Sequence, residues 1–231
     1  KLMPFLGSSP ANSSIASPIA TLSDTQVLGS GAEEDVKITF DGNAVDYHIG
    51  MDDSGDTLNF GKGSTLGTTT NQTFDTNGII LRPLQPAFNA YMDSTGVNNY
   101  ATGNNHTISL GTEVFDTNAD FDNSNDVFTA PVTGVYRFSG AYMFNSLDSA
   151  CTGHKFELVT SDGTYRYIID MASWSISDPD NMTFQIQADC PMDSGDTAKL
   201  QFQFVDGAAQ SDTGSTDRSL QEVFFSGFLI G

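Results

Sequence analysis

The sequence predicts an all-β protein, in which a β-sandwich head of the jelly-roll type follows a short N-terminal stalk of β-hairpins. Three observations predict this class. Apolar and polar residues alternate in many short segments, turn dipeptides such as Asp-Gly, Ser-Gly and Asn-Gly lie between these segments, and no helical period persists along the 231 residues. Hydrophobic residues make up 38% of the chain and include 17 Phe, so we expect most of it to fold.

The charge of the chain excludes some classes of partner. Asp and Glu number 29 against 9 Lys and Arg, which gives a net charge of −20, and the basic residues are scattered from Lys1 to Arg218 without a cluster in the sequence. Because a phosphate backbone needs a concentrated positive patch, we expect no nucleic-acid partner. No run of apolar residues is long enough to span a membrane, so we expect no membrane insertion, and the first residues lack the order of a secretory signal.

Residues 1–31 form the first predicted segment. They are rich in Ser, Ala, Pro and Gly and show no sustained period, so they cannot build a core of their own. The segment is either a flexible linker or an anchor that becomes ordered when its apolar "MPFLG" docks on a larger assembly.

Residues 32–82 form the predicted stalk. Short β segments such as "DVKITF" and "TLNFG" alternate with turn signals such as "DDSGD". About fifty residues with so few large apolar side chains bury too little surface to fold alone. We therefore expect neighbouring copies of the chain to complete the core of this segment.

Residues 83–231 form the predicted head. After Arg82-Pro83 the apolar segments lengthen and the aromatic residues concentrate. Several segments have one apolar and one polar face, which is typical of a sheet with one solvated face. Eight strands in about 150 residues predict a sandwich of two sheets. The expected strands cover residues 87–92, 106–115, 135–144, 155–160, 165–171, 182–188, 198–205 and 223–230.

Two of these strands are unusually apolar. The segment "FTAPVTGVYRFSGAYMF" (128–144) places four aromatic rings on one face, with Gly140 between them leaving room for a close approach. The last strand, "EVFFSGFLIG", is apolar on both faces, so it lies either at the centre of a sheet or under a partner subunit. We expect six aromatic residues of the two strands to form the core or a seam between subunits: Tyr136, Phe138, Tyr142, Phe144, Phe225 and Phe228.

The sequence contains one candidate metal site. The loop "DTNADFDNSND" (116–126) carries oxygen ligands of the kind that calcium prefers at alternate positions, namely Asp116, Asn118, Asp120 and Asp122. The alternative is a polar loop without metal. No catalytic constellation and no cofactor site is found, and "GKGSTLG" (61–67) lacks the Ser or Thr that a phosphate-binding loop requires after its Lys. Cys151 and Cys190 are either buried thiols or one disulfide.

The head resembles a known family. The segments "PAFNAYM" (86–92), "VFDTNADFDNSNDVFTAPVTGVYRFSGAYMF" (114–144), "GDTAKLQFQ" (195–203) and "FSGFLI" (225–230) have the order and spacing of the complement C1q-like globular head, which is related to the tumour-necrosis-factor jelly roll. The resemblance covers residues 84–231. Asp126 stands where the family pattern has Gly. The resemblance implies a compact homotrimer without enzymatic activity, and some heads of the family hold calcium.

A second resemblance concerns the stalk. The segment "DGNAVDYHIGMDDSGDTLNFGKGSTLGTT" is similar to repeats in structural fibre proteins of tailed bacteriophages. The two resemblances together imply a structural protein on the surface of a virion, a fibre, appendage or decoration that meets other virion proteins through residues 1–31. Its head would present loops to a glycan or protein of the host surface. The alternatives are a free extracellular lectin-like recognition protein and a glycan-degrading spike.

Overall fold

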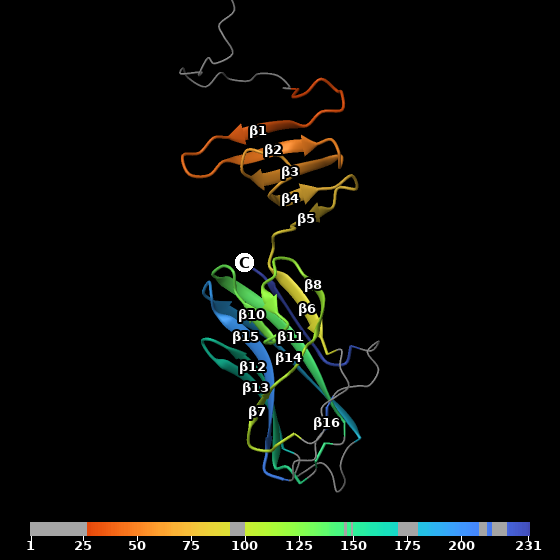
Figure 1. The fold of residues 1–231 in the computed structure, drawn as a ribbon, viewed down its shortest axis with the longest axis vertical. Coiled ribbons are helices and arrows are strands. Elements are labelled where there is room, and N and C mark those ends of the chain that lie inside the picture. The colour runs from red at the N-terminus through yellow and green to blue at the C-terminus, as the bar shows by residue number, and fades with distance from the viewer. Residues whose placement is uncertain are drawn as a thin grey trace, which may run out of the picture.

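A computed structural model describes residues 27–92, 100–145, 147–148, 150–170, 180–207, 212–213 and 221–231. Within these ranges the protein consists of antiparallel strands and contains no helix, so the prediction of an all-β protein is confirmed. One five-stranded sheet lies end to end with a two-layered sandwich along the longest axis of the molecule (Figure 1). In the described ranges, no helix has the length and apolarity to cross a membrane.

The N-terminal sheet is a simple antiparallel meander. Its strands pair in the order in which they occur in the chain, and each runs across the long axis of the molecule (Figure 1). Short polar turns join them, as the turn dipeptides predict. The strands are β1 (Val36–Phe40), β2 (Tyr47–Asp52), β3 (Thr57–Lys62), β4 (Thr70–Phe74) and β5 (Ile80–Leu81).

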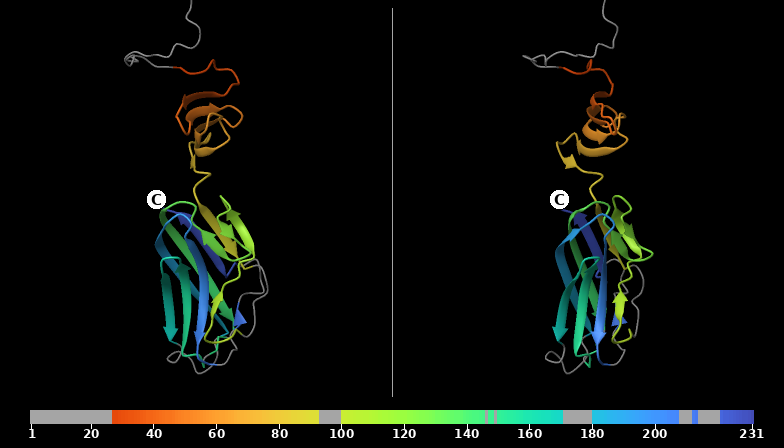
Figure 2. Two further views of the ribbon diagram at one scale, coloured as in Figure 1. Left: turned by 60° about the vertical axis from the view of Figure 1, so that its left-hand side comes forward. Right: turned by 90° about the vertical axis from the view of Figure 1, so that its left-hand side faces the viewer.

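The head contains two sheets that lie face to face (Figure 2). The first has the order β14-β11-β17-β6-β8, and the short strand β16 (Asp212–Thr213) pairs with β11. Its strands are β6 (Ala87–Tyr91), β8 (Thr112–Asp116), β11 (Gly134–Asn145), β14 (Asn181–Met192) and β17 (Phe224–Leu229).

The second sheet has the order β13-β12-β15-β10-β9, and β7 pairs with β15. In both sheets, strands from the start and the end of the head lie side by side. In the first sheet the last strand, β17, pairs with the first, β6, and in the second sheet β15 pairs with β10 and β7. This order is that of a jelly roll. Its strands are β7 (Asn105–Thr107), β9 (Phe121–Asp122), β10 (Val127–Thr129), β12 (Gly153–Thr160), β13 (Thr164–Asp170) and β15 (Thr197–Val205).

The core of the head lies between the two sheets and is dominated by aromatic rings. Tyr136, Phe138, Tyr142 and Phe144 of β11 all point into it and are at most 1% exposed. Phe138 stacks on Phe225 of β17 with ring centroids 5.5 Å apart. Across the layer, Tyr142 stacks on Phe202 of β15 at 4.8 Å. Rings of this size each bury about 150–250 Å² and so supply most of the apolar surface of the core.

Gly140 permits the close approach of the two sheets that the sequence predicts. A Cβ atom at this position would lie 2.5 Å from Cδ1 of Leu200, which belongs to the opposite sheet. Real Cβ atoms essentially never approach another carbon so closely, so a larger residue would force the buried Leu200 side chain to move.

One expected strand is wrong. The alternation over 106–115 predicts a single strand, but the chain forms two short strands that belong to different sheets, since β7 pairs with β15 and β8 pairs with β6. Between them, Ile108 and Leu110 are buried, at 1% and 0% exposure. The alternating apolar residues therefore fill the end of the sandwich where the chain crosses from one layer to the other, which the period of two does not distinguish from a strand.

The edge strand β13 also departs from its expected burial. In the segment 165–171, Tyr165 and Tyr167 belong to the apolar face, which a sheet with one solvated face would bury, yet they are 37% and 52% exposed. β13 is the last strand of its sheet, so no neighbouring strand in the described ranges covers its outer edge.

The terminal strand β17 lies at the centre of its sheet, which is the first of the two alternatives drawn from its apolar faces. Phe225 on its inner face is fully buried, whereas Phe228 on its outer face is 46% exposed. Phe228 is therefore outside the core of a single chain. Cys151 and Cys190 are both buried, and no disulfide joins them in the structure. Of the predicted N-terminal segment, residues 1–26 lie outside the described ranges.

Candidate interaction surfaces

The N-terminal sheet has one apolar face that no part of the chain within the described ranges covers. Cross-strand pairing brings its residues into rows, such as Ile38 with Ile49 and Phe60. Ile38 is 47% exposed, Phe40 55% and Tyr47 53%. We call this surface the stalk face. Lys62 and Gln72 lie on it too, and its apolar residues are Val36, Ile38, Phe40, Tyr47, Ile49, Met51, Leu58, Phe60, Phe74 and Ile80.

The opposite face of this sheet is covered by the loop between β3 and β4. His48 is 1% exposed, and its Nδ1 lies 2.8 Å from the carbonyl oxygen of Gly63. Lys37 donates to the carbonyl oxygen of Ser64. A Cβ atom at Gly50 would lie 3.0 Å from Leu66. One face of the sheet is thus completed within the chain, and the other is left open.

The head has an apolar outer face as well. The outer side of the sheet β14-β11-β17-β6-β8 carries aromatic residues around a polar centre made of serines and amides. Phe115 is 48% exposed and Phe228 46%. An ion pair between Arg137 and Asp189 crosses the same side at 2.7 Å. We call this surface the head face, and its aromatic residues are Tyr91, Phe115, Phe224 and Phe228.

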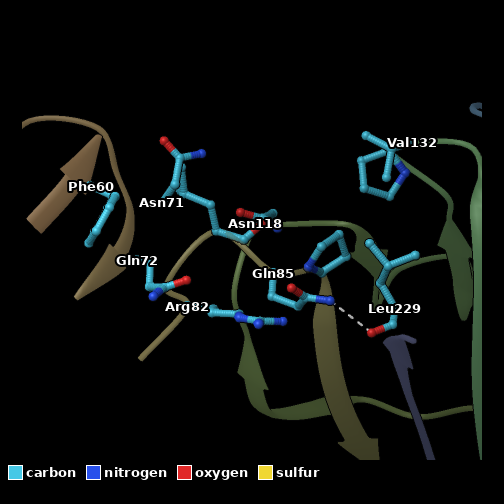
Figure 3. A pocket seen from close by; sticks show the side chains of 11 residues that line it. Phe60, Asn71, Gln72, Arg82, Gln85, Asn118, Val132 and Leu229 are labelled. Carbon is cyan, nitrogen blue, oxygen red and sulfur yellow. Dashed lines mark hydrogen bonds between the residues drawn. The ribbon is translucent and has the colours of Figure 1, made fainter. Parts of the chain in front are cut away.

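A pocket of about 670 Å³ lies where the N-terminal sheet meets the head (Figure 3). Phe60 and Gln72 line it from the sheet, and Val132 and Leu229 from the head. Gln85 fixes the connection, since its Nε2 donates to the carbonyl oxygen of Leu229 at 2.9 Å. Among the described residues that line this pocket, none carries a carboxylate.

The acidic loop that was proposed for calcium uses several of its carboxylates to bind its own backbone. Asp116, at the end of β8, accepts hydrogen bonds from the backbone N–H groups of Asn118, Asp120 and Phe121 at 3.3, 3.1 and 2.8 Å. Asp122 accepts from the N–H of Ser124 at 2.8 Å and from Asn125. Local hydrogen bonds of this kind explain why a tight loop is rich in Asp and Asn.

The structure brings Asp116 and Asp120 together, whereas the Asp122 carboxylate binds Ser124 and Asn125. Burial and the neighbouring charge of Asp116 raise the pKa of Asp120, whereas the bonds from Asn125 and Ser124 lower the pKa of Asp122. Oδ2 of Asp120 is buried and has no hydrogen-bond partner in the described ranges. No group of three His, Cys, Asp or Glu side chains suited to a metal occurs among the residues that the structure describes, and calcium at this loop stays a prediction.

Asp126 explains the departure from the family pattern. It has φ of 58°, in the left-handed region that Gly adopts most easily and that Asp tolerates. Its carboxylate accepts a hydrogen bond from the backbone N–H of Leu110 at 2.6 Å. The aspartate thus provides the required backbone conformation and a side-chain contact that Gly cannot make.

Sequence reasoning missed a third surface, because it treated the basic residues as scattered. The fold brings three of them to the outer face of the sheet β13-β12-β15, where the direct pairs include Lys155 with Gln203 and Val159 with Lys199. Arg166 lies opposite Glu157 on the neighbouring strand. We call this surface the basic face. The signal in the sequence is the alternation of long polar side chains in "HKFELV" and "KLQFQF", which is visible only once both segments are placed in one sheet.

Comparison with known proteins gives similarities of fold at low sequence identity. The globular domain of zebrafish complement 1qA protein is 18% identical, with a TM-score of 0.45, and the match covers 64% of this chain and 98% of that domain. Murine APRIL is 10% identical, with a TM-score of 0.43, 63% of this chain and 99% of the other being covered. Eiger TNF from S. frugiperda is 13% identical, with a TM-score of 0.45 and covered shares of 65% and 94%.

No protein-family model and no curated protein sequence matches the chain. The architecture of the head is therefore established by its own strand order, and its function has to be argued from the surfaces described above.

Proposed function

We propose that this chain forms a homotrimer that acts as a non-enzymatic recognition protein, in which the N-terminal sheet is the stalk and the jelly-roll sandwich the binding head. The observation that carries the proposal is the pair of open apolar surfaces, the stalk face and the head face. Exposed apolar patches of this extent on a single chain are typical of protein–protein interfaces. Three copies, rather than two, follow from the resemblance of residues 84–231 to the C1q-like heads.

The stalk face gives the strongest physical argument for association. A single sheet with one face covered by a loop has too small a core to be stable alone. Its open face carries no Asp or Glu, although the chain as a whole carries −20. Copies can therefore pack through this face without bringing carboxylates together, and the acidic residues of the turns remain in solvent.

We further propose that the protein belongs to the surface of a tailed-bacteriophage virion, as a fibre, appendage or decoration attached to other virion proteins through residues 1–31. The support is the sequence resemblance of the stalk segment to repeats of phage fibres. The described residues that line the pocket at the stalk junction carry no carboxylate, which favours binding over glycan cleavage. The ligand of the head would be a glycan or protein of the host surface.

Two measurements test the proposal. Light scattering of the full chain should report about 74 kDa, three times 24.7 kDa. An antibody against the chain should label purified phage particles. A stable species of one chain with the complete β signal in circular dichroism would contradict the trimer. Trimers that are absent from particles would leave the free extracellular recognition protein as the better description.

A further inference from the structure

The basic face gathers positive charge in a strongly acidic protein. Three of the seven basic residues in the described ranges lie there, namely Lys155, Arg166 and Lys199. Elsewhere, Arg137 is paired with Asp189. The basic face contains two carboxylates, that of the buried Glu157 and that of Asp170 at one end of β13, and Asp162 lies in the turn beyond the other end. Its net charge is therefore positive, in contrast to the −20 of the whole chain.

The register of the sheet spaces these cations evenly. Positions 155, 157 and 159 of β12 mark three successive rows on this face. Lys155 itself occupies the first row, Arg166 is paired with position 157, and Lys199 is paired with position 159. Two residues of a strand span about 6.6 Å, so the three cations lie on successive rows about 6.6 Å apart. The result is a line of positive charge that crosses three neighbouring strands.

A buried carboxylate holds the middle of this line in place. Glu157 is 1% exposed, and it accepts hydrogen bonds from Nε of Arg166 and from Nε2 of Gln201 on its two oxygens. The Arg166 side chain remains 45% exposed at the surface. A buried carboxylate with both oxygens bonded fixes the guanidinium before any ligand arrives, which lowers the entropy lost on binding.

Neutral polar groups accompany the two lysines. Nζ of Lys155 donates to Oε1 of Gln203 at 2.6 Å, and Nζ of Lys199 lies 3.5 Å from Oγ1 of Thr107. Next to Gln203, Asn105 adds another amide. Amides and hydroxyls are suited to the hydroxyl groups of sugars, and the interleaved cations are suited to carboxylates.

From these contacts we propose that the basic face binds an anionic polysaccharide whose repeating units carry carboxylates. An acidic protein is a poorer fit, since protein interfaces depend on aromatic and large apolar anchors, and the described part of this surface offers only Val159, Ile168 and Val205. The proposal rests on the head being the recognition module proposed above. The basic face and the head face belong to different layers of the sandwich.

The test uses the full chain and three polymers of defined chemistry. Polygalacturonate carries carboxylates on sugars, dextran is a neutral polysaccharide, and polyaspartate is an acidic polypeptide. Calorimetric titration at low salt should show binding of polygalacturonate that weakens as salt is added, and no binding of dextran. Equal or tighter binding of polyaspartate would overturn the choice of a polysaccharide.

Matched variants locate the site. Lys155→Gln with Lys199→Gln should lower the affinity for polygalacturonate by about tenfold. Lys37→Gln with Arg82→Gln makes the same change in net charge at exposed positions outside the basic face and the stalk face, and should change the affinity by less than about twofold. Arg166 is retained, because its removal would leave the buried Glu157 without its cation.

Light scattering of the same samples distinguishes a failure of polysaccharide binding at the basic face from a failure of the proposed trimer. A trimer that fails to bind polygalacturonate, or an equal loss of affinity in both double variants, overturns this inference and leaves the proposed assembly intact. A monomer overturns the proposed assembly, whatever it binds.

Discussion

Single residues in the core of the head set how closely its parts pack, and Gly227 in the centre of β17 is the clearest case. A Cβ atom there would lie 2.5 Å from Cδ1 and 2.7 Å from Cε1 of Phe138, and 2.8 Å from Cε1 of Phe88. Both rings are fully buried and stack on further rings, so neither can move aside. The glycine is thus required by packing and not by a turn.

We expect Gly227→Ala to lower the free energy of unfolding by about 1–3 kcal/mol, because overpacking a dense core forces rings off their preferred positions. Gly163→Ala is the control, since a Cβ atom at Gly163 meets nothing within 4 Å. It should change the stability by less than about 0.5 kcal/mol. Urea unfolding followed by circular dichroism measures both. Equal stability of the two variants would contradict this account of the ring cluster.

His154 gives a second prediction, on the dependence of stability on pH. Its ring is 2% exposed and packs against Phe204, and burial lowers its pKa to about 4, although Asp148 favours the charged form. The unfolded chain binds the proton near pH 6.5 and the folded chain near pH 4. Stability contributed by neutral His154 is therefore complete above pH 6.5, falls between pH 6.5 and 4, and changes no further below pH 4.

The variant His154→Leu removes this titration. The difference in unfolding free energy between wild type and variant should shift by about 3 kcal/mol between pH 7 and 4, in the direction of relative loss for the wild type. Since both proteins carry the same carboxylates, the titration of those groups cancels in the difference. Parallel pH profiles of the two proteins would show that His154 is hydrated in solution.

At the scale of elements, the sequence predicted where the strands lie better than which strands pair with each other. The strand expected at 135–144 is observed as β11 (Gly134–Asn145), because apolar residues on a half-buried strand must alternate with a period of two. The same period failed at 106–115, where Ile108 and Leu110 are buried in a crossing between sheets. Periodicity reports burial on one side, and it carries no information about which strand supplies the hydrogen bonds.

The candidate sites show the same limit. Lys155, Arg166 and Lys199 are far apart in the sequence, and only the pairing of β12 with β13 and β15 brings them to one face. Conversely, Asp116 and Asp122 are close in the sequence, but each binds the backbone of a different turn. Spacing in the sequence could therefore suggest the acidic loop and could not suggest the basic face.

The acidic loop yields a prediction about Asp116 itself. Its carboxylate satisfies three backbone N–H groups, so Asp116→Ala should lower the free energy of unfolding by about 1–3 kcal/mol. Asp41→Ala, at an exposed position after β1, should have an effect of less than about 0.5 kcal/mol. Thermal unfolding in a calcium-free buffer measures both. A silent Asp116 variant would mean that water replaces these bonds at no cost.

Calcium is tested separately at the same loop. The raised pKa of Asp120, caused by its burial and by Asp116, is what a nearby cation would relieve. If calcium binds, wild-type protein should unfold at a higher temperature in calcium than in chelator, and Asp120→Asn should lose that increase. The same melting temperature in both buffers would leave the polar loop as the complete explanation of this segment.

For the whole molecule, assembly depends on whether the burial of apolar surface outweighs the repulsion between negative charges. Three chains bring together about 60 negative charges, three times the −20 of one chain. Salt screens such repulsion over roughly 8 Å at physiological ionic strength. The stalk face and the head face avoid most of it, because their carboxylates are few and Asp189 is already paired with Arg137. Association should therefore strengthen as salt is raised, which is opposite to the behaviour of binding at the basic face.

The last prediction concerns the stalk, whose fold should depend on assembly. Ile38→Glu places a carboxylate on the stalk face, opposite Ile49, where a neighbouring copy would bury it without a partner. Thr39→Glu adds the same charge to the same strand on the other side, opposite His48. We expect Ile38→Glu to accelerate amide hydrogen exchange throughout β1, β2 and β3 and to lower the mass seen by light scattering. Thr39→Glu should leave both close to wild type. If the two variants behave alike, the stalk face is not the surface through which the copies meet, and the stability of this sheet has another source.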